Sequence, residues 1–252
     1  MSTNPKNNYE GITYESFKDR ASDSSLSRYQ KIGFPDAYRE GKEINIFRDI
    51  NSKLKLTRKG ITVLDIGCGC SELADHIIDN SEEHQQTLLL NDSREMLDLL
   101  PDKSFIKKIP GKFPENFSDF QDYYGKIDVI VAYSVLHHIT MDSNPYNFID
   151  KVLELLNYGG LFLIGDLQNL TKRNRFFQSK TGIDFHHEFT KDASLPPPEP
   201  TRFPDYYEKI DDGLVFGILQ RYRNFGFETF LLPQADDLPM SNRREDLLIL
   251  KN

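Results

Sequence analysis

The stretch "VLDIGCGCSEL", residues 63 to 73, places an acid, two alternating glycines and two cysteines close together. Asp65 closes an apolar run, and Gly67 and Gly69 form a turn that leads into a helical pattern. Such a turn lets the backbone approach a ligand, and the start of a helix supplies free N–H groups. Two ligands fit this description: the pyrophosphate of a dinucleotide, and an amino acid joined to a nucleoside.

The acids around the turn favour the second ligand. A dinucleotide site reads Gly-x-Gly-x-x-Gly, and its third glycine would stand where the chain has Glu72. A carboxylate beside a helix N-terminus also suits a pyrophosphate poorly. Backbone N–H groups can instead take the carboxylate of an amino acid, while Asp65 takes its ammonium group. An NAD-binding oxidoreductase is therefore a distant alternative.

The two cysteines, Cys68 and Cys70, are separated by one residue. That spacing at the end of a strand is poor for a mutual disulfide. It is also a weak metal signal, because no second Cys pair or neighbouring Cys/His set completes a tetrahedral site. We expect Cys68 to line the ligand site, no metal at this turn, and a reducing cytoplasm as the protein's location.

Strand and helix patterns alternate through the middle of the chain, and the strands are apolar on both faces. This pattern predicts an α/β fold with a doubly wound, mostly parallel, seven-stranded sheet. The last two strands have no helix between them, so we expect them to pair antiparallel and to place a reversed strand at the sheet edge. The expected strands are 61–67, 86–92, 103–111, 126–134, 161–167, 227–233 and 246–252, and the expected helices are 71–80, 94–101, 146–160 and 213–226.

Two further regions surround this core, which we place at residues 57–252. Residues 1–56 form an N-terminal helical arm or cap, loose over residues 1–20 and helical after Pro35. Residues 170–210, which contain "FHHEF" and "LPPPEPTRFP", form an irregular, lid-like insertion. Both regions are rich in aromatic residues and flank the core in sequence, so either can close over a substrate.

The first motif resembles that of the class I S-adenosylmethionine-dependent methyltransferases, commonly Asp/Glu-x-Gly-x-Gly-x-Gly. The resemblance extends from about residue 60 to residue 168 and returns in the final two strands. Ser71 stands where the third glycine is usual. That position begins the helix, for which serine is a good residue. The resemblance implies a Rossmann-like fold and S-adenosyl-L-methionine as the methyl donor.

The resemblance also implies which residues hold the donor. An acid that ends the second strand holds the ribose, and in "LLLNDSREML" Asp92 is the preferred match, while the family's usual spacing to the following serine selects Asn91. Lys112 stands where the family often has an acid that binds the adenine amino group, so we expect Phe113 and the backbone to hold the adenine. The residues implied as cofactor-binding are Asp65, Gly67, Cys68, Gly69, Asn91, Asp92, Phe113, Tyr133 and Ser134.

Three histidines are candidates for a general base. His137 and His138 follow the fourth strand at the edge where open sheets bind ligands, and a neutral imidazole there can take a hydroxyl proton. His137 is the preferred base, His138 the second, and His186 in the insertion the third. A divalent metal held by Asp184, His186, His187 and Glu188 is an alternative use of the insertion, but no metal site is predicted.

The charge balance narrows the partners. Acidic residues outnumber basic ones by 39 to 31, the formal net charge is −8, and no dense basic run occurs, so a nucleic-acid partner is disfavoured. No apolar run approaches a membrane span. The pattern "SVLHHI … GDL" and the N-terminal region resemble methyltransferases of bacterial surface-polysaccharide pathways. That likeness favours O-methylation of a sugar or nucleotide-activated sugar.

Other functions stay open. The acceptor can be another small metabolite methylated on nitrogen or oxygen. The chain can also be a non-catalytic module that binds S-adenosylmethionine. The oligomeric state cannot be read from the sequence.

Overall fold

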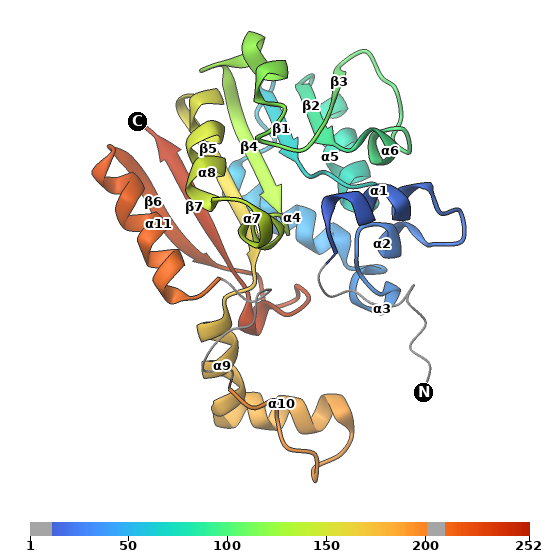
Figure 1. Ribbon diagram of the computed structural model, residues 1–252, viewed down its shortest axis with the longest axis vertical. Helices are drawn as coiled ribbons and strands as arrows, with labels where there is room; N and C mark the ends of the chain where they lie inside the picture. The colour runs from blue at the N-terminus through green and yellow to red at the C-terminus, as the bar shows by residue number, and fades with distance from the viewer. Residues whose placement is uncertain (1–11, 201–209) are drawn as a thin grey trace.

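The computed structural model describes residues 12–200 and 210–252. Its centre is a seven-stranded sheet in the order β3-β2-β1-β4-β5-β7-β6 (Figure 1). Strands β1 to β5 are parallel to one another, and β7 is antiparallel to both β5 and β6. The predicted doubly wound, mostly parallel sheet with an antiparallel C-terminal strand is confirmed. The strands are β1 (Thr62–Ile66), β2 (Thr87–Asp92), β3 (Ile106–Pro110), β4 (Ile127–Tyr133), β5 (Leu156–Leu167), β6 (Phe227–Pro233) and β7 (Glu245–Lys251).

The position predicted for the reversed strand is wrong, because β7 lies between β5 and β6 and β6 forms the edge. The burial pattern accounts for this order. Leu247 and Ile249 of β7 are fully buried, whereas Phe230 of β6 is 43% exposed. The strand with more apolar surface to cover therefore takes the place with a neighbour on each side.

Helices cover both faces of the sheet. On one face, α4 (Glu43–Leu54), α5 (Glu72–Glu83) and α6 (Arg94–Leu97) share a core with β1 and β2. On the other face, α7 (Leu136–Asp142), α8 (Pro145–Leu155), α11 (Asp212–Asn224) and the 3-10 helix η2 (Phe117–Tyr123) do the same with β1 and β4. The spacing of Ile46, Ile50 and Leu54 puts one stripe of α4 into the first core.

The N-terminal region is helical from residue 14 onward. It consists of α1 (Tyr14–Ser22), α2 (Arg28–Lys31), α3 (Asp36–Arg39) and α4. The expectation of a loose arm over residues 1–20 is wrong for residues 12–20, and residues 1–11 lie outside the described residues. Thr13 caps α1 by accepting a hydrogen bond from the Ser16 backbone N–H. The helix predicted after Pro35 is present as α3 and α4.

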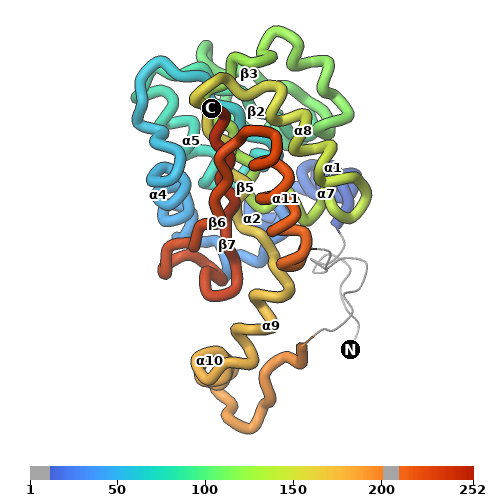
Figure 2. Tube along the Cα trace, turned by 90° about the vertical axis from the view of Figure 1, so that its left-hand side faces the viewer, coloured from blue at the N-terminus to red at the C-terminus, as the bar shows by residue number. Residues whose placement is uncertain are grey.

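Two further boundaries differ from the prediction. Helix α8 ends at Leu155, before the expected end at residue 160, because β5 begins at Leu156 and includes Gly159 and Gly160. The insertion is irregular only in part: residues 170–190 form α9 (Leu170–Gln178) and α10 (Lys180–Thr190), whereas residues 191–200 contain no helix or strand. Asn169 and Ser179 start these helices with side-chain caps. Figures 1 and 2 show the two helices projecting away from the sheet.

Part of the predicted insertion, residues 201–209, lies outside the described residues. Among the described residues, no helix combines the length and the apolar character needed to span a membrane.

Candidate active site

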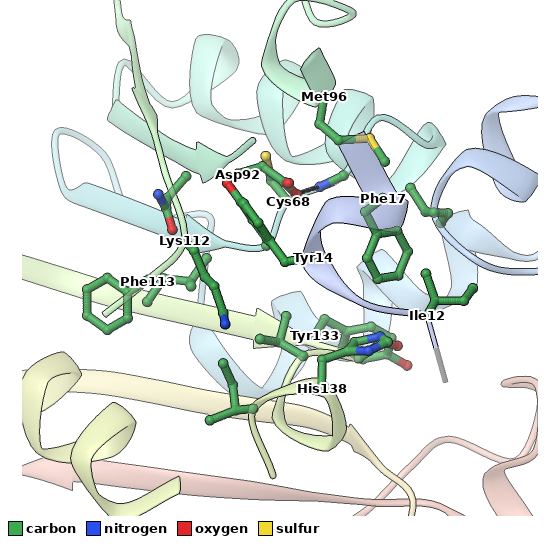
Figure 3. Close-up of a pocket in the computed structure, with 18 of the residues that line it drawn as sticks. Ile12, Tyr14, Phe17, Cys68, Asp92, Met96, Lys112, Phe113, Tyr133 and His138 are labelled. Atoms are coloured by element: carbon green, nitrogen blue, oxygen red, sulfur yellow. Dashed lines mark hydrogen bonds between the residues drawn. The ribbon is translucent and has the colours of Figure 1, made fainter. Parts of the chain in front are cut away.

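A pocket of about 290 Å³ lies at the carboxyl ends of β1, β2 and β4 (Figure 3). The N-terminal segment around α1 and the start of α7 supply its other walls. The pocket residues come from every part of the first motif and from positions far from it. They include Ile12, Thr13, Tyr14, Phe17, Phe34, Arg39, Asp65, Gly67, Cys68, Gly69, Asn91, Asp92, Lys112, Phe113, Tyr133, Ser134 and His138.

The turn between β1 and α5 requires its two glycines. Gly67 has φ +70° and Gly69 has φ +60°, a region that side chains disfavour. A Cβ on Gly67 would lie 2.6 Å from Cγ2 of Val135, and one on Gly69 would lie 2.6 Å from Cγ2 of Ile32. The two glycines therefore let the turn pack between α7 and the N-terminal region while its backbone borders the pocket.

A buried glutamate supports the start of α5. Ser71 occupies the predicted N-cap position, but its side chain makes no capping hydrogen bond to the helix. The Leu73 backbone N–H instead donates to Oε2 of Glu43 at 2.7 Å, and Glu43 is fully buried. The chain thus anchors the turn from α4, 30 residues earlier. Sequence reasoning missed Glu43, because capping patterns are local and this contact is not.

Asp65 is a buried carboxyl at the pocket with no ion pair among residues 12–200 and 210–252. Its exposed fraction is 4%. Burial raises its pKa to about 8, and the nearby Asp92 adds to this effect. A carboxyl held in this way gains from a cation that binds beside it. The ammonium group of an amino acid is such a cation, so Asp65 fits the predicted ligand.

Asp92 and Asn91 have different tasks at the end of β2. The carboxylate of Asp92 accepts hydrogen bonds from the backbone N–H groups of Gly69 at 2.9 Å and Ser93 at 2.6 Å. Burial raises the Asp92 pKa to about 6. The Asn91 amide donates to the backbone oxygens of Ile109 and Gly111. Asp92 thus ties the glycine turn to β2, while Asn91 ties β2 to the end of β3.

The remaining residues implied as cofactor-binding also line the pocket. Phe113 is 3% exposed and meets Phe120 and Phe148 edge to face, so the ring is held rigidly at the wall. Cys68 and Cys70 are buried free thiols, and burial raises the pKa of both, to about 11 for Cys70. Tyr133 and Ser134 end β4 at the pocket.

Of the two adjacent histidines on α7, one lines the pocket and the other does not. His138 lines the pocket beside Phe17, with ring centroids 5.0 Å apart, whereas His137 is not among the pocket residues. The two imidazole rings lie 3.9 Å apart. Burial lowers the pKa of His138 to about 4, and a hydrogen bond to the Ile12 backbone offsets only part of this effect. Burial, His138 and two arginines hold the His137 pKa well below its usual range.

His186, the third candidate base, lies on α10, and it is not a pocket residue. Its ring faces Phe177 of α9 at a centroid distance of 6.3 Å. Within the part of the chain that the structure describes, no group of three or more His, Cys, Asp or Glu residues could hold a metal ion.

The N-terminal region, predicted as an aromatic cap, contributes to the pocket wall, but sequence reasoning missed its arginine, Arg39. Tyr14 and Phe17 of α1 line the pocket (Figure 3). Arg39 of α3 lines it too. Arg39 is 4% exposed, donates to Oγ of Ser134 at 3.0 Å and lies over the Phe34 ring at 4.0 Å. The aromatic residues near residue 14 signalled a cover, but nothing in the sequence indicated a buried arginine.

Comparison with known families agrees with the fold and the pocket. Residues 38–194, more than half of the chain, match a family model described as a methyltransferase domain. The chain belongs to this methyltransferase family. The prediction of a class I S-adenosylmethionine-dependent methyltransferase is confirmed at the level of family and fold. Among curated proteins, none matches the sequence.

Solved structures similar to this methyltransferase share its fold at low identity. The plantazolicin methyltransferase BpumL in complex with SAH is 15% identical, with a TM-score of 0.56 over 95% of this chain and 98% of that chain. The CurJ carbon methyltransferase is 17% identical, with a TM-score of 0.52 over 93% and 63%. A SAM-dependent methyltransferase from Aquifex aeolicus is 13% identical, with a TM-score of 0.51 over 89% and 98%.

Proposed function

We propose that this methyltransferase transfers a methyl group from S-adenosyl-L-methionine to a hydroxyl of a small-molecule acceptor. The observation that carries the donor assignment is Asp65, a buried carboxyl at a glycine turn with no ion pair among the described residues. Its carboxylate would bind the ammonium group of the donor. The N–H groups around Gly67 and Gly69 would take the donor's carboxylate.

The nucleoside half of the donor would lie between β2 and β3. Each oxygen of Asp92 accepts one backbone N–H, which leaves lone pairs for the two ribose hydroxyls. Asn91 has its amide N–H groups committed to backbone, so Asp92 is the better candidate for this contact. Phe113 offers a rigid ring for the adenine. The protein's part in the displacement is to position the acceptor and to exclude water.

We assign the role of general base to His138 in place of His137. His138 lines the pocket, and its Nδ1 atom is buried without a hydrogen-bond partner among the described residues. Its lowered pKa keeps the imidazole neutral at physiological pH, the form that accepts a proton. Nδ1 is therefore free to receive the hydroxyl proton as the acceptor is methylated.

For the acceptor we propose a sugar or nucleotide-activated sugar in surface-polysaccharide biosynthesis. The aromatic rings of Tyr14, Phe17 and Phe34 in the pocket wall support this, because the C–H faces of a sugar ring pack well on aromatic faces. An amine acceptor is the second candidate. It is favoured by the weak basicity of His138, since a neutral amine attacks without a base.

The test is a methyl-transfer screen of the wild-type protein with S-adenosylmethionine and a panel of sugars, nucleotide-sugars and small amines, read by mass spectrometry. We expect a hydroxyl-bearing sugar to gain one methyl group. Methylation of amines only would overturn the hydroxyl assignment. Binding of the donor without transfer to any member of a broad metabolite panel would favour a non-catalytic binding module.

A further inference from the structure

Beyond the donor pocket, three arginines gather where β5 and β7 meet. Arg39 comes from α3, whereas Arg243 and Arg244 come from the loop before β7, which includes the 3-10 helix η3 (Ser241–Arg243). Asp166 of β5 lies among them. The N–H groups of Arg244 and Arg39 approach its carboxylate at 3.4 and 3.8 Å. Figure 1 shows α9 leaving the sheet in this region, after β5.

The backbone here is held in a rare conformation. Asp166 has φ +60° and Ser134, at the end of the neighbouring strand, has φ +59°. Left-handed conformations at residues other than glycine persist where the surrounding structure imposes them, and such positions cluster at functional sites. Ser134 Oγ donates to Asp166 at 2.5 Å and accepts from Arg39 at 3.0 Å. The strained pair thus fixes Arg39 at the pocket wall.

Arg243 is the guanidinium in this group without an ion pair among the described residues. Its side chain donates a hydrogen bond to the neighbouring Asn242, and the rings of Phe177 and Phe185 lie 5.5 and 5.9 Å from its central carbon. Partial burial, Arg244 and Arg173 lower its pKa to about 10, against the smaller opposite effects of Tyr38 and Asp166. A half-buried cation among like charges is unfavourable until an anion joins it.

The arginine group adjoins the pocket through the two histidines. Arg39 and Arg244 both act on His137, whose ring lies 3.9 Å from that of His138. One molecule could therefore place an anionic group beside Arg243 and Arg244 and a second group beside His138. The ion pairs support an anion: Arg39 and Arg244 share the carboxylate of Asp166, and Arg39 also faces Glu43, whereas Arg243 has no carboxylate at ion-pair distance among the described residues.

We propose that Arg243, with Arg244, forms an oxyanion-binding site that holds an anionic group of the acceptor. The guanidinium forks match the geometry of phosphate or carboxylate oxygens. The rings of Phe177 and Phe185 pack beside the Arg243 guanidinium. The identity of the occupant as the acceptor rests on the proposed function, whereas the anion site itself does not. A nucleotide-activated sugar would present a diphosphate here, and an acidic metabolite would present a carboxylate.

The test is calorimetric titration of the SAH-saturated protein with inorganic pyrophosphate and, separately, with malonate, at constant ionic strength. Arg243→Gln should weaken binding of the preferred anion by about 10- to 100-fold, the usual effect of losing a charge-assisted hydrogen bond. The matched control is Arg221→Gln. Arg221 also lies over aromatic rings, but it is paired with Asp150 on α8. This control should keep the wild-type affinity within about twofold.

The two anions separate the possible sources of the charge. Tighter binding of pyrophosphate indicates a phosphate-bearing acceptor, and tighter binding of malonate indicates a carboxylate. Arg243→Lys, which keeps the charge and loses the fork, should fall between wild type and Arg243→Gln. Thermal unfolding checks that each variant is folded.

Two results would overturn the proposal. The first is a folded Arg243→Gln protein that binds the anions as the wild type does. The second is a wild type that binds neither anion more tightly than Arg243→Gln. SAH binding by the same proteins is the independent readout of the donor pocket: its absence would contradict the proposed function, whereas its presence with an unaltered anion affinity would contradict only the arginine site.

Discussion

The donor pocket and the arginine site are neighbours with opposite electrostatic character. In the pocket, Asp65 and Asp92 are carboxyls whose pKa values are raised to about 8 and about 6 by burial. At the arginine site, Arg39 and Arg244 share the carboxylate of Asp166, and Arg243 has no ion pair among the described residues. The first region stabilises a positive group, and the second stabilises a negative one.

This difference in charge would direct the methyl donor to one region and the acceptor to the other. A donor with an ammonium group gains from the pocket acids and loses beside the arginines, and an anionic acceptor does the reverse. His137 and His138 stand between the two regions, both neutral at physiological pH because their pKa values are lowered. We expect the largest effect from substitution of the histidines, a smaller one from substitution in the glycine turn, and the smallest from the titration of Asp65.

The largest expected effect is on turnover. His138→Ala should lower methyl transfer to a hydroxyl by about 10²–10⁴-fold, the usual contribution of a positioned general base. SAH affinity should change little, since the donor contacts proposed above do not include His138. The control is His137→Ala, which lies outside the pocket lining and should have the smaller effect. A larger loss in His137→Ala than in His138→Ala would return the role of base to His137.

The next effect is on the glycine turn. Gly69→Ala forces a left-handed alanine and brings Cβ within 2.6 Å of Ile32. We expect a loss of about 1–3 kcal/mol of stability and at least roughly a tenfold loss of SAH affinity. The control is Gly60→Ala, which has φ +70° but no atom within 4 Å of the added Cβ. In Gly60→Ala, chemical denaturation should show a loss of stability from backbone strain, and calorimetry should show unchanged SAH affinity. Equal SAH affinity in both variants would contradict the close packing of the turn.

The smallest effect is on the pH dependence of the ligand-free protein. The pKa of Asp65 is raised to about 8, so the folded protein holds a proton that the unfolded chain releases near pH 4. Stability therefore falls as pH rises from about 4 to about 8, by an amount on the order of a few kcal/mol. Asp65→Asn should flatten this slope and exceed the wild type in stability above pH 8. Asp92, raised to about 6, should leave a weaker slope at lower pH. Thermal unfolding of both proteins at several pH values measures the difference, and parallel slopes would contradict the assignment.

Much of the donor side could be predicted from the sequence, because its residues are contiguous with strand ends. The run from Asp65 to Gly69 and the end of β2 lie at the carboxyl edge that a parallel sheet places together. The choice between Asn91 and Asp92 needed the structure, since it depends on the backbone of β3. The position of β7 also needed it, because sequence order does not specify sheet order.

The acceptor side could not be predicted in the same way. Arg39, Asp166 and Arg243 lie more than 70 residues apart in the sequence, and the ion pair of Arg39 with Asp166 requires α3 to pack near the end of β5. The choice of His137 over His138 failed to anticipate the pocket lining because consecutive residues on a helix face different sides, and sequence alone does not say which side is the pocket. The helices α9 and α10 were missed because the Pro-rich stretch after residue 195 suggested a loop throughout.

The most direct test of the account is the proton balance of SAH binding at pH 7. Wild type should bind SAH with a micromolar dissociation constant, on the order of −8 kcal/mol. Asp65, protonated in the free protein, should release close to one proton as the ammonium group binds. Calorimetry in two buffers of different ionisation enthalpy measures that proton directly. Asp65→Asn should bind about 100-fold more weakly and release no proton. Undiminished SAH binding by Asp65→Asn, or no SAH binding by the wild type, would contradict the account.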